Sequence, residues 1–177
     1  MTYCQFCKDL PADNPNKYYH DKEYGFPLDN DNDLFNRLVL EINQAGLSWN
    51  TILNKRYNFE EAFDQFNIQK VANYTEEDRV RLLSNAGIIR NKLKINAAIY
   101  NANAILKLQE SHSSFHNWIL SHGENDMKDW VKIFKKPFKF VGGEIVKEFL
   151  QSTGYIETPH DKDCPVYAEI KALKPKQ

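Results

Sequence analysis

Cysteine is scarce in this chain, with three residues in 177. An odd and small number of cysteines does not indicate a disulfide framework, and points to free thiols or metal ligands in a reducing compartment. Long hydrophobic runs are also missing: no stretch approaches the roughly 20 apolar residues of a membrane-spanning helix. The first residues, MTYCQFCKDLP, lack the apolar core of a secretory signal. These absences predict a soluble, intracellular protein.

The chain has no excess of charge of one sign, since 23 Lys and Arg face 24 Asp and Glu for a net charge of −1. A near-neutral balance gives no global signal for a nucleic acid or a membrane surface, so an anionic partner would have to be bound by local patches. Aromatic residues are plentiful, with three Trp, nine Tyr and eleven Phe, which argues against disorder. The length suits one domain with a substantial core.

Alternating strand patterns and internal repeats are absent, and helical spacing dominates after residue 27. Before that point the chain is rich in Pro, Asn, Asp and Tyr, and we expect a mostly irregular arm with short helical pieces. Helical spacing, capping residues and glycine stops predict the following helices: 33–45, 48–57, 59–64, 68–73, 75–87, 91–109, 115–120, 128–133 and 144–152. The predicted fold class is all-α.

The segment Leu40–Trp49, LEINQAGLSW, places a single carboxylate beside the apolar stripe of the predicted helix 33–45. That carboxylate belongs to Glu41. Gly46 reads as the helix stop, so the residues up to Trp49 are expected in a turn. An acid at the flank of an apolar face, next to an aromatic ring, suits recognition of a flat polar or cationic ligand. The alternative is an edge glutamate that reaches back to water.

A second motif lies between residues 83 and 94, where one helix is expected to stop at Gly87 and the next begins at once after a tight turn. This is the arrangement of a helix–hairpin–helix, which presents backbone N–H groups and a helix N-terminus to a phosphate. Arg90, Lys92 and Lys94 add positive charge where a nucleic-acid backbone would pass. The alternative is an ordinary pair of helices with a solvated basic start.

The candidate metal ligands are three cysteines and two histidines: Cys4, Cys7, His20, His160 and Cys164. The last two are four residues apart, so one turn of helix or a tight loop can direct both at one ion. Four nitrogen and sulfur donors are what a closed structural zinc site needs. Two sets compete, one with Cys4, Cys7, His160 and Cys164, the other with His20 in place of Cys7. Either set ties the N-terminal arm to the C-terminal tail, and chance scatter of these residues is the remaining alternative.

Two further clusters have weaker signals. Residues 18–25 combine three tyrosines with acidic residues, which offers stacking faces with a hydroxyl group or simply packs the arm onto the core. Five lysines between residues 128 and 139 form either a second phosphate-facing surface or a solvated helix face.

Taken together, these segments resemble the DNA-3-methyladenine glycosylase I family of helix–hairpin–helix base-excision enzymes. The matching motifs are Cys4, YHDKEYG from Tyr19, LEINQAGLSW from Leu40, NAGIIRNKLKI from Asn85, FKFVG from Phe138 and His160-x3-Cys164. They follow the family's order over nearly the whole chain. Departures include Tyr24 and Phe6 where the family has tryptophan, and Asn16 where a pocket tyrosine is expected.

The resemblance implies a helical fold that holds a base flipped out of duplex DNA. It implies one structural Zn²⁺ bound by Cys4, His20, His160 and Cys164, which leaves Cys7 free. It assigns Glu41 as the catalytic, base-contacting acid. The implied substrate-binding residues are Tyr19, Trp49, Phe6 and Tyr24. The implied DNA-binding residues are Gly87, Ile89, Arg90, Lys92 and Lys94.

The expected activity is monofunctional hydrolysis of the N-glycosidic bond of 3-methyladenine in double-stranded DNA containing alkylated bases. We expect a monomer in a bacterial-type cytoplasm, without membrane association. The expected organisation is a single glycosylase domain over 1–177, with an arm at 1–27, a helix–hairpin–helix at 75–109 and a zinc-binding tail at 155–177. The alternatives are a degenerate relative that binds DNA or a modified base without excision, and a zinc-stapled helical interaction module.

Overall fold

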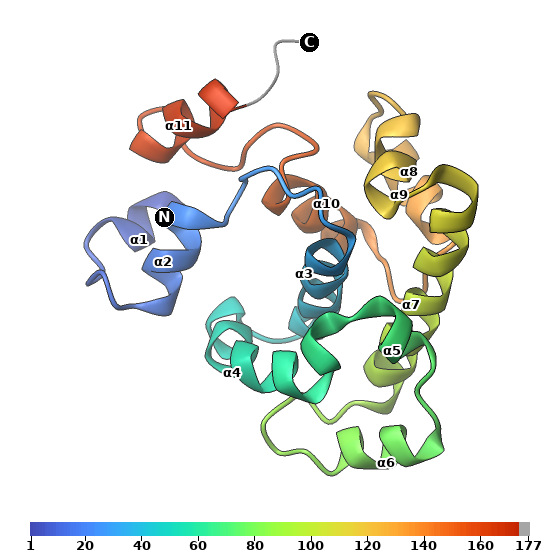
Figure 1. The fold of residues 1–177 in the computed structure, drawn as a ribbon. Coiled ribbons are helices and arrows are strands. Elements are labelled where there is room, and N and C mark those ends of the chain that lie inside the picture. The colour runs from blue at the N-terminus through green and yellow to red at the C-terminus, as the bar shows by residue number, and fades with distance from the viewer. Residues whose placement is uncertain (174–177) are drawn as a thin grey trace. The chain divides into compact units, whose positions relative to one another are not determined.

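The computed structural model describes residues 1–173, and every regular element in that range is a helix (Figure 1). The elements in chain order are α1 (Tyr3–Lys8), α2 (Pro15–Lys22), α3 (Asp31–Gln44), α4 (Trp49–Ala62), the 3₁₀ turn η1 (Asp64–Phe66), α5 (Ile68–Ala72), α6 (Glu76–Leu83), α7 (Lys92–His112), α8 (Phe115–Ser121), α9 (Met127–Lys135), α10 (Gly143–Ser152) and α11 (Pro165–Leu173). The all-α prediction is confirmed. Among these residues no helix is long and apolar enough to cross a membrane. The last four residues of the predicted tail 155–177 lie outside the described range.

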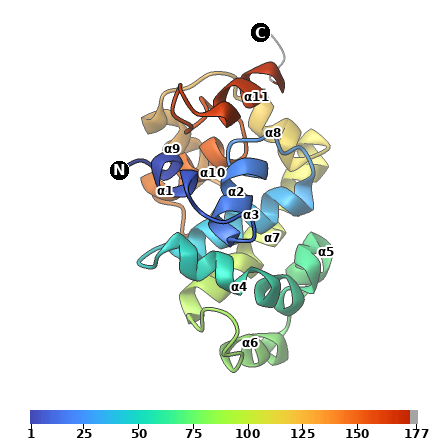
Figure 2. The ribbon, with the colours of Figure 1, turned by 90° about the vertical axis from the view of Figure 1, so that its left-hand side faces the viewer.

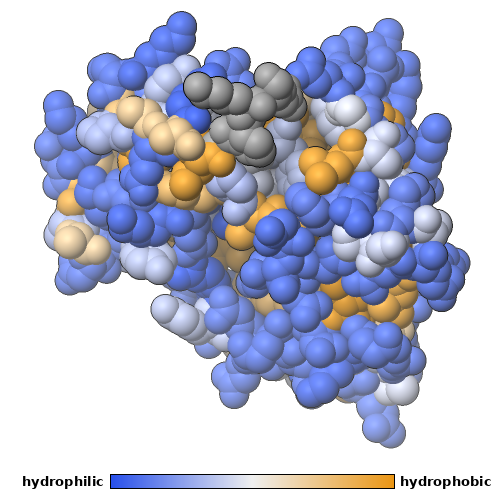
Figure 3. Space-filling model, turned by 45° about the horizontal axis from the view of Figure 1, so that its top comes forward, coloured by the Kyte–Doolittle hydropathy of each residue, from blue (hydrophilic) through white to orange (hydrophobic). Residues whose placement is uncertain are grey.

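The chain divides into two compact units. The first unit combines Met1–Leu28 with the chain from Glu148 onward, and the second is Asp29–Lys147. Helix α10 begins in the second unit and ends in the first. One face of the molecule is shown in Figure 3, where hydrophilic residues predominate, as expected for a chain with many mixed charges.

In the first unit, the segment after α2 is hydrogen-bonded to the end of α10. The N–H of Gly25 donates to the carbonyl of Ser152 at 2.9 Å, and that of Leu28 donates to Thr153 at 3.1 Å. Gly154 has φ +83°, and a Cβ there would lie 2.9 Å from Pro27 Cα, so only glycine fits this close approach. These contacts join the two ends of the chain through backbone groups.

The N-terminal arm is more ordered than its composition suggests, because polar side chains begin both of its helices. The Thr2 hydroxyl accepts from the N–H of Gln5 at α1, and Asn14 accepts from Asn16 at α2, which has Pro15 in its first turn. Helix α11 was not predicted. It begins at Pro165, immediately after the candidate ligand Cys164.

The second unit is built around α7, which contacts α3, α5, α6 and α8. Helices α6 and α7, which are joined by the predicted hairpin, are visible in both Figure 1 and Figure 2. The apolar residues on the buried side of α7 are alanines and isoleucines: Ile95, Ala97, Ala98, Ile99, Ala102, Ala104 and Ile105. Alanine lets neighbouring helices approach closely, and each buried isoleucine contributes about 1.5–3 kcal/mol of hydrophobic stabilisation. The predicted helix 91–109 is confirmed and extends to His112.

Helix α4 joins two segments that were predicted separately as 48–57 and 59–64. No glycine or proline interrupts the chain between them, and Phe59, Ala62 and Phe63 are buried together on one side. The Phe63 and Phe66 rings stack at 5.7 Å across the turn η1. The three residues of that turn all have positive φ, which ends the helix sharply.

Candidate active site and metal centre

Glu41 lies at the start of the last turn of α3, and only 4% of it is exposed. The helix begins with Asn30, whose side chain accepts from the N–H groups of Asn32 and Asp33 at 3.0 and 3.1 Å. It ends with Ala45 as the capping residue, followed by Gly46 at φ +80°. The structure therefore places the carboxylate inside the protein rather than at a solvent-facing edge.

Trp49 is the first residue of α4 and is half-buried, whereas the sequence placed it in a turn. Ser48 is the reason for the difference. Its hydroxyl accepts from the N–H of Thr51 at 3.2 Å, which caps the helix one residue before the tryptophan. The chain between Glu41 and Trp49 is thus a helix end, the exposed residues 45–48, and a new helix start.

The hairpin between α6 and α7 is held by side chains of α4 and of the turn itself. Asn85 Oδ1 accepts from the N–H of Gly87 at 2.8 Å. Asn58 donates to the Gly87 carbonyl at 3.2 Å, and Lys55 donates to that of Ala86 at 3.3 Å. A Cβ at Gly87 would lie 3.0–3.1 Å from the side chains of Asn85 and Asn58. The turn is therefore built tightly around a glycine.

The predicted DNA-binding residues have different surroundings. Arg90 and Lys92 are exposed, and Ile89 is half-buried in the turn. Lys94 is 5% exposed, and its ammonium donates to the carbonyls of Asn43 at 2.9 Å and Ala45 at 2.7 Å. Burial lowers the pKa of Lys94. Two of the three basic side chains of the hairpin thus face solvent, and the third is used inside the protein.

The other predicted substrate-binding residues form one aromatic cluster in the first unit. The Tyr19 and Tyr24 rings lie 5.4 Å apart, and Tyr3 contacts Tyr24 edge-on at 5.3 Å and stacks on Phe6 at 6.1 Å. Tyr19 is 2% exposed, whereas Phe6 is 46% exposed. The sequence analysis did not include Tyr3 in this cluster. Its position directly before the candidate ligand Cys4 could have indicated that it lies close to the other aromatic residues of the arm. Asn16, where a tyrosine was expected, is buried and accepts from the Tyr3 hydroxyl at 3.1 Å.

The predicted base-binding residues therefore belong to both units. Glu41 and Trp49 lie in Asp29–Lys147, together with the hairpin. Tyr19, Tyr24 and Phe6 lie in the unit that contains both chain ends.

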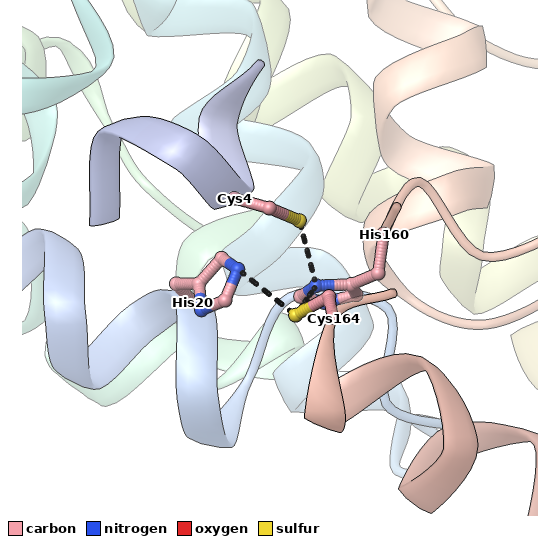
Figure 4. Close-up of side chains that lie close together, drawn as sticks. All are labelled: Cys4, His20, His160 and Cys164. Atoms are coloured by element: carbon pink, nitrogen blue, oxygen red, sulfur yellow. Dashed lines mark hydrogen bonds between the residues drawn. The ribbon is translucent and has the colours of Figure 1, made fainter. Parts of the chain in front are cut away.

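Four of the five candidate metal ligands come together in the first unit (Figure 4). They are Cys4 from α1, His20 from α2, and His160 and Cys164 before α11. Their ligand atoms all lie within 4.8 Å of one another. Cys4 Sγ is 3.4 Å from His160 Nδ1, and Cys164 Sγ is 3.8 Å from both His160 Nδ1 and His20 Nε2. Cys7 is fully buried elsewhere, with Sγ 3.7 Å from the Asn16 carbonyl oxygen.

These positions fit a metal ion. A tetrahedron with zinc–ligand bonds of about 2.0–2.3 Å has edges of about 3.3–3.8 Å, close to the observed separations. The second nitrogen of each imidazole is also held: His20 Nδ1 is 2.6 Å from Asp21 Oδ1, and His160 Nε2 is 2.6 Å from the Tyr24 carbonyl oxygen. Such outer partners orient metal-binding histidines and set the tautomer. The site therefore has both the ligands and their supports.

The electrostatics of the cluster agree with this interpretation. Burial raises the pKa of the Cys4 thiol to about 11, although the N–H of Asp161, 3.3 Å from Sγ, favours the thiolate. Burial lowers the pKa of His160, which keeps its imidazole neutral, as a metal ligand must be. A cation at the centre would supply the charge that a buried thiolate needs.

Comparisons with known proteins agree with the motifs. The family profile described as methyladenine glycosylase matches residues 10–167. The DNA-3-methyladenine glycosylase of Haemophilus influenzae is 35% identical over 166 residues, covering 83% of this chain and 89% of that protein. DNA-3-methyladenine glycosylase 1 of Escherichia coli is 36% identical over 168 residues, covering 84% and 89%. The structure of 3-methyladenine DNA glycosylase I from Staphylococcus aureus, which addresses 3-methyladenine recognition, matches with a TM-score of 0.79 at 31% identity over 99% of this chain and 97% of that chain.

Proposed function

The chain belongs to the methyladenine glycosylase family, and from this membership we infer that it is a DNA-3-methyladenine glycosylase, which removes 3-methyladenine from alkylated DNA. The observation that carries the activity is the identity of 35–36% over more than four fifths of the chain. The observation that supports the site is the buried carboxylate of Glu41 at the end of α3.

The chemistry of the lesion suits a buried acid. Methylation at N3 leaves adenine cationic, which weakens the glycosidic bond and makes the base a good leaving group. Glu41 attracts this cation and accepts a hydrogen bond from its exocyclic amine, while Trp49 stacks on the ring and adds a cation–π interaction of about 0.5–2 kcal/mol. Normal adenine is neutral, so it loses both interactions and its leaving-group advantage. Selectivity thus follows from charge.

The reaction is hydrolysis. Water forms a bond to the sugar C1′ and releases a proton to solvent, while the glycosidic bond breaks and its electrons go to the cationic base. The products are neutral 3-methyladenine and an abasic site. A Schiff-base mechanism would require a lysine amine at C1′. In the hairpin, Lys92 is exposed and the Lys94 ammonium is bonded to two carbonyls. Neither hairpin lysine is placed as an evident Schiff-base nucleophile, which supports monofunctional excision without strand cleavage.

The hairpin is the DNA anchor. The N–H groups of Gly87 and Ile88 are used within the turn, where both donate to Asn85. The backbone N–H of Ile89 and the N-terminus of α7 are the proposed phosphate-binding groups, and Arg90 and Lys92 add charge from exposed positions. Flipping the base costs a few kcal/mol, least where the pair is already weakened. In the first unit, the proposed base-recognition groups are the hydroxyl of Tyr19 and the aromatic rings of Tyr24 and Phe6.

The metal is one Zn²⁺ held by Cys4, His20, His160 and Cys164. Two thiolates and two imidazoles are typical zinc ligands, and four protein ligands leave no open position for catalysis. When bound, this ion contributes folding energy to the unit that contains both chain ends, and the reacting base is handled by other residues. The protein is proposed to act as a monomer. The bacterial relatives support a cytoplasmic location.

We treat residues 1–177 as one glycosylase domain. Helix α10 continues from the second unit into the first without interruption, which supports this organisation. The predicted subdivisions, with an arm at 1–27, a helix–hairpin–helix at 75–109 and a metal-binding tail at 155–177, all fall within it.

The test is release of free bases from duplex DNA treated with a methylating agent, measured by chromatography with the full-length, zinc-loaded protein. We expect 3-methyladenine in the supernatant and abasic sites in uncleaved strands. A folded protein that binds free 3-methyladenine without releasing it from DNA would be a degenerate relative. A folded protein that binds neither the base nor DNA would be an interaction module.

A further inference from the structure

Lys94 occupies an unusual place for a lysine in a basic hairpin. It is the third residue of α7, two positions after the exposed Lys92 and four after the exposed Arg90, yet only 5% of it is exposed. Its ammonium donates to the backbone carbonyls of Asn43 at 2.9 Å and Ala45 at 2.7 Å, which belong to the end of α3. The charge points into the protein and away from the surface that its neighbours present.

The end of α3 needs such a donor. The last carbonyls of a helix have no partner within the helix, and the partial negative charge at this end favours a cation. The chain turns away at Gly46 with φ +80°, and residues 45–48 are exposed. A buried ammonium is costly unless it is hydrogen-bonded, so lysine and carbonyls stabilise one another. The result is a direct bond between the start of α7 and the end of α3.

The two carbonyls belong to residues that are two and four positions beyond Glu41, one in the last turn of α3 and one in its capping residue. On the other side, the N–H of Lys94 donates to Asn91 Oδ1 at 3.1 Å, and Asn91 directly follows the hairpin turn. A short sequence of contacts in the second unit therefore connects the hairpin, Lys94, the last turn of α3 and Glu41.

We propose that Lys94 is a positioning residue that holds the helical turn of Glu41 in register with the DNA-binding hairpin. This inference rests on the proposed roles of Glu41 and of the hairpin. The two hydrogen bonds of Lys94 to the end of α3 keep a constant distance between the phosphate-binding hairpin and the base-contacting carboxylate of Glu41. Lys55 and Asn58 of α4 brace the same hairpin through other carbonyls, but Lys94 is bonded to α3 itself.

The experiment compares Lys94→Met with Lys92→Met in the full-length, zinc-loaded protein. Methionine keeps an unbranched apolar side chain and removes the ammonium. Three quantities are measured: affinity for free 3-methyladenine, the single-turnover excision rate at saturating DNA, and the salt dependence of binding to undamaged duplex. We expect Lys94→Met to lower the single-turnover rate about 100-fold, as small misplacements of reacting groups do. It weakens free-base binding and leaves the salt slope unchanged.

Lys92→Met is the matched control and should behave in the opposite way. It lowers the salt slope by about one and leaves the affinity for the free base unchanged. Lys94→Arg, which keeps a cation with several donors, should recover part of the excision rate lost in Lys94→Met. A purely structural role would lower the melting temperature of Lys94→Met without this division between base binding and DNA binding.

A lower salt slope with unchanged base binding in Lys94→Met would make Lys94 a phosphate contact and overturn the proposal, as would three unchanged quantities. Should Lys94→Met not fold, amine methylation of the wild-type protein decides. We expect Lys94 to resist methylation whether or not undamaged DNA is present. Lys92 should be methylated in the free protein and protected when DNA is bound. Reactivity of Lys94 that DNA suppresses overturns the proposal. A wild-type protein that neither binds nor excises 3-methyladenine instead contradicts the proposed function.

Discussion

His160 reaches the backbone carbonyl oxygen of Tyr24, 136 residues earlier in the chain, with Nε2 at 2.6 Å. Because this nitrogen donates the hydrogen bond, Nδ1 is left as the metal ligand, and it lies 3.4 Å from Cys4 Sγ. The contact connects the metal centre to the YHDKEYG segment, whose Tyr19 and Tyr24 are proposed to meet the base. His160 is therefore both a candidate metal ligand and a hydrogen-bond donor to the backbone of the aromatic cluster.

Cys164→Ser should lose the metal ion, because serine is a poor zinc ligand and three remaining donors do not close the site. The measurement is metal content per chain after dialysis, with limited proteolysis of the two chain ends as a second readout. Cys7→Ser is the matched control, since Cys7 lies outside the ligand cluster, and it should retain one ion per chain. Equal metal content in both variants would contradict the assignment.

Glu41→Gln should fold and bind undamaged DNA normally but recognise the lesion poorly. The amide keeps the shape and loses the charge that attracts a cationic base. Hydrogen bonds to charged groups contribute about 1.5–3 kcal/mol, so affinity for free 3-methyladenine should fall about 10- to 150-fold. Titration followed by tryptophan fluorescence measures it. Unchanged affinity would remove Glu41 from the base site.

Arg90→Glu should weaken binding to all duplexes regardless of lesion and reduce the salt dependence, because it reverses a charge beside the phosphate-binding turn. Binding isotherms at several salt concentrations provide the test. Lys107→Glu, at an exposed position toward the other end of α7, makes the same charge change far from the hairpin. An equal effect of both substitutions would indicate general charge repulsion rather than a hairpin contact.

Asp31→Ala should reduce the free energy of unfolding by about 1–3 kcal/mol. Asp31 accepts from the N–H groups of Phe115 at 2.9 Å and His116 at 3.1 Å, and from the Gln109 side chain at 2.7 Å. The substitution leaves the start of α8 without these acceptors. Chemical denaturation measures the change. Asp33→Ala, in the same turn but exposed, should cost less than about 0.5 kcal/mol.

Asp78 should make stability depend on pH in the acid range. The N–H of Thr75 at 2.9 Å and then Arg81 lower the pKa of this carboxyl in the folded state. The unfolded chain then binds the proton more readily, so the stabilisation is complete above the unfolded pKa of about 3.9 and is lost as pH falls through the folded value. The stability difference between wild type and Asp78→Asn should shrink as pH drops below about 4. A constant difference would contradict the mechanism.

Helix positions were predictable where local signals agree. Thr75 and Asn91 precede α6 and α7 as expected, and the glycine at 46 follows α3. Errors arose where a local signal was weak or misjudged. Trp49 was placed in a turn because Gly46 reads as a helix stop, whereas Ser48 begins the next helix only two residues later. Helix α11 was missed because it is short, with nine residues, and follows a loop that shows no helical spacing.

The sequence by itself determined the helical class and the motifs that identify the family, because periodicity, caps and short motifs are local properties. It left the ligand set open from residue types alone, since Cys4 and Cys164 are 160 positions apart and only folding brings them together. It also grouped Lys94 with Arg90 and Lys92 as one basic patch. Helical spacing from Lys94 to Ala98 and Asn101, both buried, was a signal that it faces inward. Only the tertiary structure shows which groups Lys94 binds, because its partners are backbone carbonyls 49 and 51 residues away. Residue types do not reveal which backbone carbonyls a fold leaves for a side chain to bind.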